Sequence, residues 1–349
     1  MKRIPTGVGL CALGLGIAAW PVVDRLVPRA DAAGIGSAAA LLLAESATAQ
    51  NVPARCSADI NGDGTVNGDD LGALLAAWGP CATVVSPSWA TVLEAQPNPG
   101  VVTDAALRSA ITATGWAWRV RDVATQIEMV LVPPGSYQMG CTPSAQFGCS
   151  NDESPVRTVT LTNAIYVSRF EVTQSQWQAR MGTNPSFFQG SSYPDAANRP
   201  VEQVSWELAQ GFLAATGMRL LTEAEWEYAC RAGTTTAFSN NSSDGNTVGT
   251  IAWFATNSGN QTKAVGTKAG NRFGLHDMHG NVWEWVSDWY GTYPSACQAN
   301  PTGPASGTNR VVRGGAWSAS TDFLRSSDRI FGGVTSSSSA VGFRVARTP

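Results

Sequence analysis

Oxygen-bearing side chains recur within one twelve-residue segment at the spacing of a calcium loop. Carboxylate or amide oxygens stand at its first, third, fifth, ninth and twelfth positions, from Asp59, Asn61, Asp63, Asn67 and Asp70. Gly64 takes the position of the sharp turn, and Thr65 follows it with a main-chain carbonyl. Hard Ca²⁺ prefers clustered oxygen ligands in this arrangement. The spacing therefore predicts a calcium site, and calcium is the one cofactor that we expect.

A short amphipathic helix is predicted to leave this loop. Apolar residues follow at helical spacing before a Gly-Pro pair at 79–80, namely Leu71, Leu74, Leu75 and Trp78. The loop and its exit helix resemble one repeat of a dockerin, a calcium module that docks onto cohesin domains of extracellular assemblies. The resemblance implies a module over residues 50–85 and a cohesin-like or cell-surface protein as its partner. Dockerins carry two repeats, and one is visible here.

A second group of polar residues lies at 275–284. Asp277 and Glu284 flank a Gly-Asn turn that exposes main-chain carbonyls, a set that suits a hard cation. The two histidines of the chain, His276 and His279, stand on either side of Asp277. The sequence holds no third histidine to complete a zinc or iron site, so we interpret both as turn or surface residues.

Three glutamates on one predicted helix have the composition of a catalytic cluster, Glu223, Glu225 and Glu227. Thr222 and Glu225 instead fit a capping box, in which each side chain bonds the other residue's backbone N–H. We interpret the glutamates as capping and helix-surface residues. The sequence shows no Ser-His-Asp arrangement and no Gly-rich phosphate loop.

The elements that position these groups are predicted to be short. Apolar spacing and capping residues predict helices over 103–113, 171–181, 204–215 and 223–231. Alternating residues predict a hairpin from 118–122 and 127–132, and a further strand at 137–140 follows a Pro-Pro-Gly turn. Beyond residue 233 the chain is mostly Gly, Ser, Thr and Asn with short strands.

The composition describes one large domain preceded by something smaller. The chain has 349 residues with 36 Gly and 13 Trp, and 14% of its residues are charged; this length can bury a large core. A formal net charge of −3 is too small to steer a polyanion, which disfavours nucleic-acid binding. We expect a leader at 1–49, the calcium module at 50–85, a linker and domain entry at 86–125, and the large domain at 126–349.

The N-terminal segment predicts export. Lys2 and Arg3 precede an apolar run at 7–20, and a second apolar patch at 38–43 leads to a small-residue pattern at 47–49. Two alternatives stay open: a true start further into the chain, or a first run retained as a membrane anchor. No later stretch is long and apolar enough to cross a bilayer. We expect a bacterial protein that is secreted or held at the cell surface.

Six cysteines follow Cys11 of the leader, and an even number in an exported chain favours disulfides over metal ligation. Local pairing is predicted where two cysteines bracket one short unit. The remaining two are paired by elimination, which gives Cys56–Cys81, Cys141–Cys149 and Cys230–Cys297.

An ordered set of short motifs is spread over a region of nearly two-thirds of the chain. The motifs lie at 129–135, 171–177, 184–186, 199–206, 219–228, 273–275, 280–285, 313–317 and 342–344. In this order they resemble the sulfatase-modifying factor family, also called formylglycine-generating enzymes. The resemblance implies an α+β fold, a low-regularity variant of the C-type-lectin architecture. It also implies a structural calcium held by the side chains of Asp277 and Glu284 and by the carbonyls of Gly280 and Val282.

Members of that family that make formylglycine bind copper(I) with two cysteine thiolates, a soft ligand set, and activate oxygen at a substrate cysteine. Counted from Arg313-Gly-Gly, the matching positions hold Ala319 and Leu324, which cannot ligate copper. We therefore predict a non-catalytic extracellular binding or assembly protein. The alternative is an enzyme of the same family with a different reaction.

The C-terminal stretch supports a related interpretation. Exposed-looking positions between Trp317 and Gly342 include Ser318, Ser320, Asp322, Ile330, Phe331, Val334 and the serines at 336–339. Lectin-fold proteins diversified by retroelements carry variable binding positions in a similar stretch ending in Gly-Phe-Arg. This resemblance implies a surface that binds ligands.

Overall fold

The computed structural model describes residues 84–142 and 146–349. They belong to a compact unit that runs from Thr83 to Pro349. The predicted leader, the calcium loop with its exit helix and the predicted Cys56–Cys81 link lie outside the described residues. None of the helices in the described ranges has the length and apolarity needed to span a membrane.

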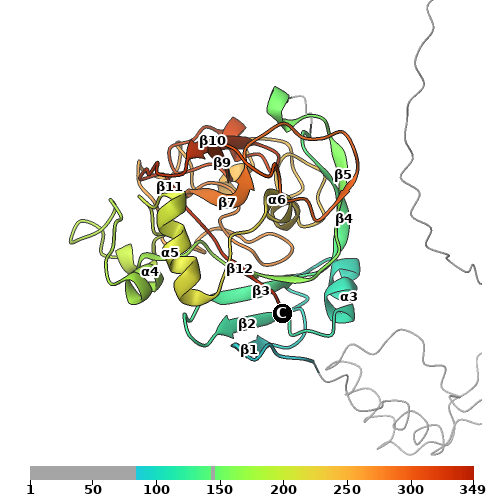
Figure 1. The fold of residues 1–349 in the computed structure, drawn as a ribbon, viewed down its shortest axis with the longest axis horizontal. Helices are drawn as coiled ribbons and strands as arrows, with labels where there is room; N and C mark the ends of the chain where they lie inside the picture. The colour runs from blue at the N-terminus through green and yellow to red at the C-terminus, as the bar shows by residue number, and fades with distance from the viewer. Residues whose placement is uncertain (1–83, 143–145) are drawn as a thin grey trace, which may run out of the picture. The chain divides into compact units, whose positions relative to one another are not determined.

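A five-stranded antiparallel sheet joins the two ends of the described chain (Figure 1). In spatial order its strands are β1 (Ala90–Glu94), β2 (Arg119–Asp122), β3 (Glu128–Val132), β6 (Ile165–Ser168) and β12 (Ala346–Arg347). The predicted hairpin is the β2–β3 pair, in which Arg121 faces Glu128 across the strands. Residues 86–125, expected as linker and domain entry, supply β1, β2 and the helix α3 (Ala105–Ala113).

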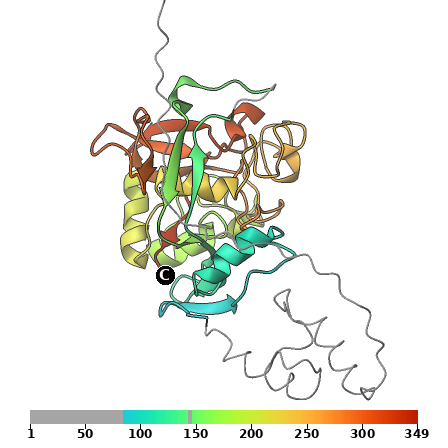
Figure 2. The ribbon, with the colours of Figure 1, turned by 90° about the vertical axis from the view of Figure 1, so that its right-hand side faces the viewer.

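Two smaller sheets carry the rest of the domain. The four-stranded sheet contains, in spatial order, β10 (Arg329–Gly333), β9 (Asn309–Arg313), β7 (Trp283–Trp289) and β11 (Val341–Gly342). The three-stranded sheet contains β4 (Gly135–Met139), β5 (Arg157–Leu161) and β8 (Gln298–Ala299). In Figure 2 the paired β4 and β5 stand upright in green, with α3 below them in cyan.

The predicted helices that fall within the described residues are confirmed, and each begins directly after its capping residue. They are α3 after Asp104, α4 (Gln174–Met181) after Thr173, α5 (Trp206–Thr216) after Ser205 and α6 (Glu223–Arg231) after Thr222. Each cap accepts a hydrogen bond from a backbone N–H of the first turn, which would otherwise have no partner. Short 3₁₀ turns occur at Asn151–Glu153, Ala196–Asn198, Val248–Thr250 and Thr321–Leu324.

The apolar core has a large and a small part. The large cluster joins all three sheets and the helices around buried aromatic residues such as Trp118, Trp177 and Trp226. The small cluster lies under the loops between α6 and η4 (Thr321–Leu324). Mixed helix and sheet content with long irregular connections confirms the predicted α+β class.

Candidate functional site

The predicted second calcium segment forms the turn that leads into β7. Gly280 has a φ of +79°, and a Cβ added there would collide with the carbonyl oxygen of Trp253. Asn281 follows with a φ of +58°. Only glycine tolerates both the left-handed backbone and the close approach. The Gly-Asn turn that the sequence predicts is therefore present and tightly enclosed.

Two of the predicted ligands, Asp277 and Glu284, are buried beside a third carboxylate, Glu171. Glu171 accepts hydrogen bonds from the Asn281 side chain at 2.6 Å and from the Val282 backbone at 3.0 Å. Sequence analysis missed Glu171, which lies 110 residues before the turn that it binds.

The hydrogen bonds of Asp277 and Glu284 differ. Asp277 Oδ2 accepts from the Gly266 backbone at 2.6 Å, while its Oδ1 is buried with no hydrogen-bond partner. Both oxygens of Glu284 accept hydrogen bonds from Arg344, at 2.6 to 2.9 Å, and Oε2 also accepts from Trp226 Nε1 at 2.7 Å. One guanidinium therefore balances a group of three carboxylates.

Burial and this excess of negative charge shift the pKa values of Glu171 and Asp277. Burial, and then the charge of Asp277, raise the pKa of Glu171 well above its usual range. Burial likewise raises the pKa of Asp277 to about 6. A hard cation at the unpartnered Asp277 Oδ1 would relieve both effects, and oxygen donors suit calcium, whereas both oxygens of Glu284 are already occupied by Arg344 and Trp226. In the two described ranges, no three His, Cys, Asp or Glu side chains are grouped to hold a metal ion. The predicted ligand set needs only two side chains, because main-chain carbonyls complete it.

The two histidines make separate structural hydrogen bonds. His276 Nδ1 donates to the Lys268 carbonyl at 2.8 Å. His279 Nδ1 donates to the Leu324 carbonyl at 2.6 Å, and its Nε2 accepts from the Ser239 backbone at 3.1 Å. Burial lowers the pKa of His279 to about 4, which keeps the ring neutral. His279 is fully buried, so the interpretation as a turn or surface residue is wrong for this histidine.

The positions that resemble the family's cysteine pair lie against apolar side chains. Leu324 is fully buried in the small cluster with Phe147, Phe238 and Phe254, and Ala319 packs against it. At Gly315 (φ +79°), an added Cβ would collide with the Leu324 side chain, so this packing is close. Copper(I) needs soft sulfur ligands, and neither side chain carries a donor. The residues present therefore do not fit a copper ion held by these two positions.

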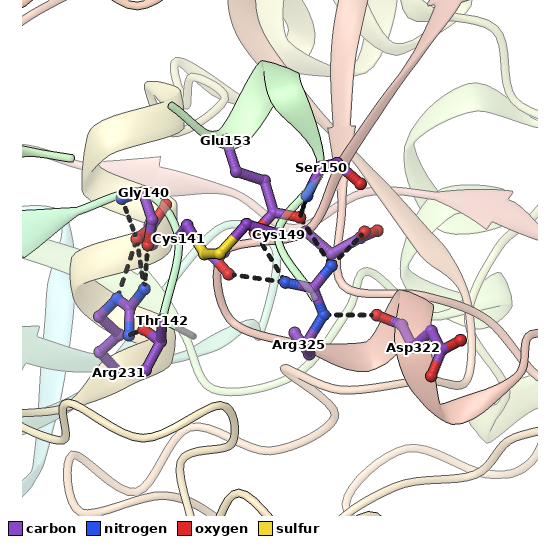
Figure 3. Close-up of a disulfide and its surroundings, with 12 residues drawn as sticks. Gly140, Cys141, Thr142, Cys149, Ser150, Glu153, Arg231, Asp322 and Arg325 are labelled. Carbon is purple, nitrogen blue, oxygen red and sulfur yellow. Dashed lines mark hydrogen bonds and ion pairs between the residues drawn. A yellow bond between two sulfur atoms is a disulfide. The ribbon is translucent and has the colours of Figure 1, made fainter. Parts of the chain in front are cut away.

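A disulfide closes the loop that contains Phe147 of this apolar cluster. Figure 3 shows the disulfide close to Glu153 and Arg325. The predicted Cys141–Cys149 link is confirmed. Phe147, inside the loop, packs edge-on against Phe238 at 5.5 Å. Just beyond it, Glu153 pairs with Arg325 through two hydrogen bonds of 2.6 and 2.7 Å. Arg325 directly follows Leu324, so this pair ties the disulfide loop to the end of the cluster.

The glutamates of α6 have two different roles. Glu225 completes the capping box with Thr222, as predicted. Glu223 and Glu227 are buried, and their interpretation as helix-surface residues is wrong. Their carboxylates pair with three arginines in a buried ion network, Glu223 with Arg329 and Arg313, and Glu227 with Arg231 and Arg313. Arg231 lies one turn after Glu227 on α6, but Arg313 and Arg329 are on the distant strands β9 and β10, so helical spacing alone did not reveal the network.

The predicted Cys230–Cys297 link is wrong. Cys230 is a free, fully buried thiol on α6, 3.6 Å from His279 Nε2 and 3.5 Å from Ser326 Oγ. Cys297 is disulfide-bonded, so its partner is another residue. Burial raises the pKa of Cys230 to about 12, so the thiol stays protonated beside a neutral histidine. This arrangement does not produce a thiolate nucleophile.

An aromatic surface exposes two rings, Phe187 and Phe323, which are backed by the buried Phe188 and Trp283 and the half-buried Trp317. Phe187 and Phe323 are 62% and 46% exposed, unlike most large apolar side chains of the domain. Phe188 contacts Phe187 and Trp317 at ring-centroid distances of 5.1 and 5.3 Å, and Phe323 lies 6.4 Å from Trp283.

The segment before β11 joins the two halves of the aromatic surface. Trp317 Nε1 donates to the Ser339 carbonyl at 3.0 Å, and the Trp283 backbone donates to the neighbouring Ala340 carbonyl at 2.8 Å. The surface therefore continues from the 184–190 loop to the 316–324 loop. Both loops overlap motifs noted in the sequence, but only the folded structure shows that they lie side by side.

Several known proteins are similar in sequence to parts of this chain. The chlamydial serine/threonine-protein kinase pkn1 of Chlamydia caviae is 37% identical over 163 residues, which are 44% of this chain and 25% of the kinase. The chain spans 38% of the pkn1 kinase of Chlamydia pneumoniae. A formylglycine-generating enzyme of Thermomonospora curvata is 29% identical over 285 residues, covering 63% of this chain and 93% of the enzyme.

Solved structures share the fold. Treponema denticola variable protein 1 matches with a TM-score of 0.57 and 29% identity, over 64% of this chain and 95% of that protein. PvdO from Pseudomonas aeruginosa also matches with a TM-score of 0.57 and 29% identity, over 66% of this chain and 98% of PvdO. The family model of the sulfatase-modifying factor enzyme 1-like domain matches residues 102–349. The chain therefore belongs to the sulfatase-modifying factor family.

Proposed function

We propose that the protein is an exported binding protein whose sulfatase-modifying factor domain does not oxidise cysteine to formylglycine. The observation that carries this proposal is the packing at Ala319 and Leu324. Where copper chemistry would need two thiolates, the domain has an alanine and a buried leucine surrounded by phenylalanines.

The aromatic surface is the proposed ligand site. Exposed aromatic residues contribute large contact areas with few rotatable bonds, and they dominate many protein interfaces. Here Phe187 and Phe323 are held by neighbouring rings rather than free in solvent.

Calcium completes the proposal. The loop containing Asp59, Asp63 and Asp70 would make the N-terminal module a calcium-dependent attachment unit for a cohesin-like or cell-surface partner. The turn between Asp277 and Glu284 would hold a structural calcium in the large domain. Both assignments rest on oxygen ligands at suitable spacing, and the second is supported by the unpartnered Asp277 Oδ1.

An activity assay tests the catalytic part of the proposal. The purified chain is incubated with copper, oxygen and a cysteine-containing sulfatase peptide, with the Thermomonospora curvata enzyme as the positive control. Mass spectrometry should show the aldehyde product only in the control. Formation of the aldehyde by this chain, at a rate that depends on copper, would overturn the proposal.

A further inference from the structure

A cavity of about 340 Å³ lies beside the buried ion network of α6, two members of which, Glu223 and Arg329, line it. Its lining comes from β4, β5, the start of α6, the end of β7 and the 291–304 loop. Polar side chains dominate it, including Thr292, Gln298, Asn300 and Thr302. Four charged residues also reach the lining, Arg157, Glu223, Asp288 and Arg329. This size and chemistry are typical of a site for a small polar ligand.

Arg157 stands out because its charge has no counter-ion. The residue is 6% exposed, and its guanidinium carbon lies 4.0 Å from the ring centroid of Tyr293. Its Nη2 contacts only the sulfur of Met139, at 3.5 Å. Nε and Nη1 are buried with no hydrogen-bond partner, and no carboxylate of the described residues forms an ion pair with Arg157.

The acids of the cavity are already engaged elsewhere. Glu223 accepts from Arg329 Nε and Nη2 at 2.8 and 2.9 Å and from the Tyr293 hydroxyl at 2.9 Å. Asp288 accepts from the Glu223 backbone at 2.9 Å and from its neighbour Ser287 at 3.0 Å. Arg329 is saturated by Glu223 and two main-chain carbonyls. Arg157 is therefore the one cation of this lining that is left unpaired.

We propose that this cavity binds a small carboxylate whose oxygens accept hydrogen bonds from Nε and Nη1 of Arg157. A buried guanidinium without a partner is unfavourable, and an anion supplies both the charge and the acceptors that it lacks. One unpaired positive charge beside two acids favours a singly charged group over phosphate. The amide and hydroxyl side chains of Gln298 and Thr302 suit a ligand that also carries hydroxyl groups.

Titration calorimetry with sodium glucuronate, at constant ionic strength against chloride, tests the proposal. The wild-type chain should show saturable binding with one site. Arg157→Gln should weaken glucuronate binding by about tenfold or more, because a charge-assisted contact is lost. Arg121→Gln is the matched control: Arg121, on β2, pairs with Glu128 of β3, neither residue lines the cavity, and the loss of Arg121 should leave binding unchanged.

A second variant keeps the test decisive if Arg157→Gln does not fold. At pH 8, above the pKa of about 7 to which burial raises Asp288, Asp288→Asn removes a negative charge from the cavity lining and should tighten glucuronate binding by about threefold. Unsaturable binding to the wild type, equal binding to Arg157→Gln, or unchanged binding to Asp288→Asn would each contradict the proposal. Binding of inorganic phosphate but not of glucuronate or acetate would overturn the assignment of a carboxylate.

Discussion

At the scale of single residues, Glu284 and Arg344 illustrate how a buried charge depends on a distant partner. Their side chains are 1% and 0% exposed, and they meet across 60 residues of sequence. Sequence analysis found Glu284 because of its spacing from Asp277 in one short motif. It found no role for Arg344, since a charge pair between distant segments leaves no local pattern.

Replacing Glu284 should therefore weaken folding strongly. Glu284→Gln leaves Arg344 buried with a neutral partner, and breaking a buried pair costs about 3 to 5 kcal/mol. Urea denaturation followed by tryptophan fluorescence measures the free energy of unfolding. Glu225→Gln is the control, since its partner Arg219 is 40% exposed and a smaller loss is expected. Calcium binding by the loop at 59–70 should be unchanged. Equal stability of wild type and Glu284→Gln would refute a structural role for this carboxylate.

At the scale of elements, the disulfide loop at 141–149 holds one wall of the small apolar cluster. The local pairing was predicted because two cysteines bracket one short unit. The incorrect third pairing came from elimination, which ignores position: Cys230 faces the core from α6, beside His279. Helices were predictable from caps such as Thr173 and Thr222, whereas the pairing of β7 with β11 depends on residues far apart in sequence.

Opening this loop should loosen the cluster without unfolding the domain. A double Cys141→Ser and Cys149→Ser variant releases a loop with a sequence separation of 8, which the chain-entropy model values at about 2 to 3 kcal/mol. Hydrogen exchange should speed up around Phe147 and Phe238 more than in the five-stranded sheet. Uniform exchange changes, or none, would show that the loop does not support the cluster.

At the scale of the whole molecule, several buried acids make stability depend on pH. Burial raises the pKa values of Glu202, Asp288 and Asp328 to about 7. Their values in the unfolded chain are about 4. Each raised pKa therefore adds stability at low pH, and that contribution is lost as the pH rises through 7. Glu202 is the clearest case, because it accepts hydrogen bonds only from two backbone N–H groups, those of Phe187 and Phe188.

Glu202→Gln should flatten this dependence. The variant lacks the titrating group, so its free energy of unfolding should fall less than that of the wild type between pH 5 and pH 8. The difference should be about 1 to 2 kcal/mol. Comparing two proteins at each pH cancels the titration of His279 and of other groups. If the free energies of unfolding of the two proteins change in parallel with pH, the pKa of Glu202 is not raised in the folded protein.

The closing of the five-stranded sheet by β12 also has a consequence in time. During synthesis, β1, β2, β3 and β6 leave the ribosome long before residues 344–347, yet β6 completes its pairing only with β12. Until then, Glu171, Asp277 and Glu284 also lack the guanidinium of Arg344. A nascent chain therefore cannot settle early into the native state, and contacts this distant slow folding. For a chain that must cross a membrane before it folds, such a delay would keep it competent for export.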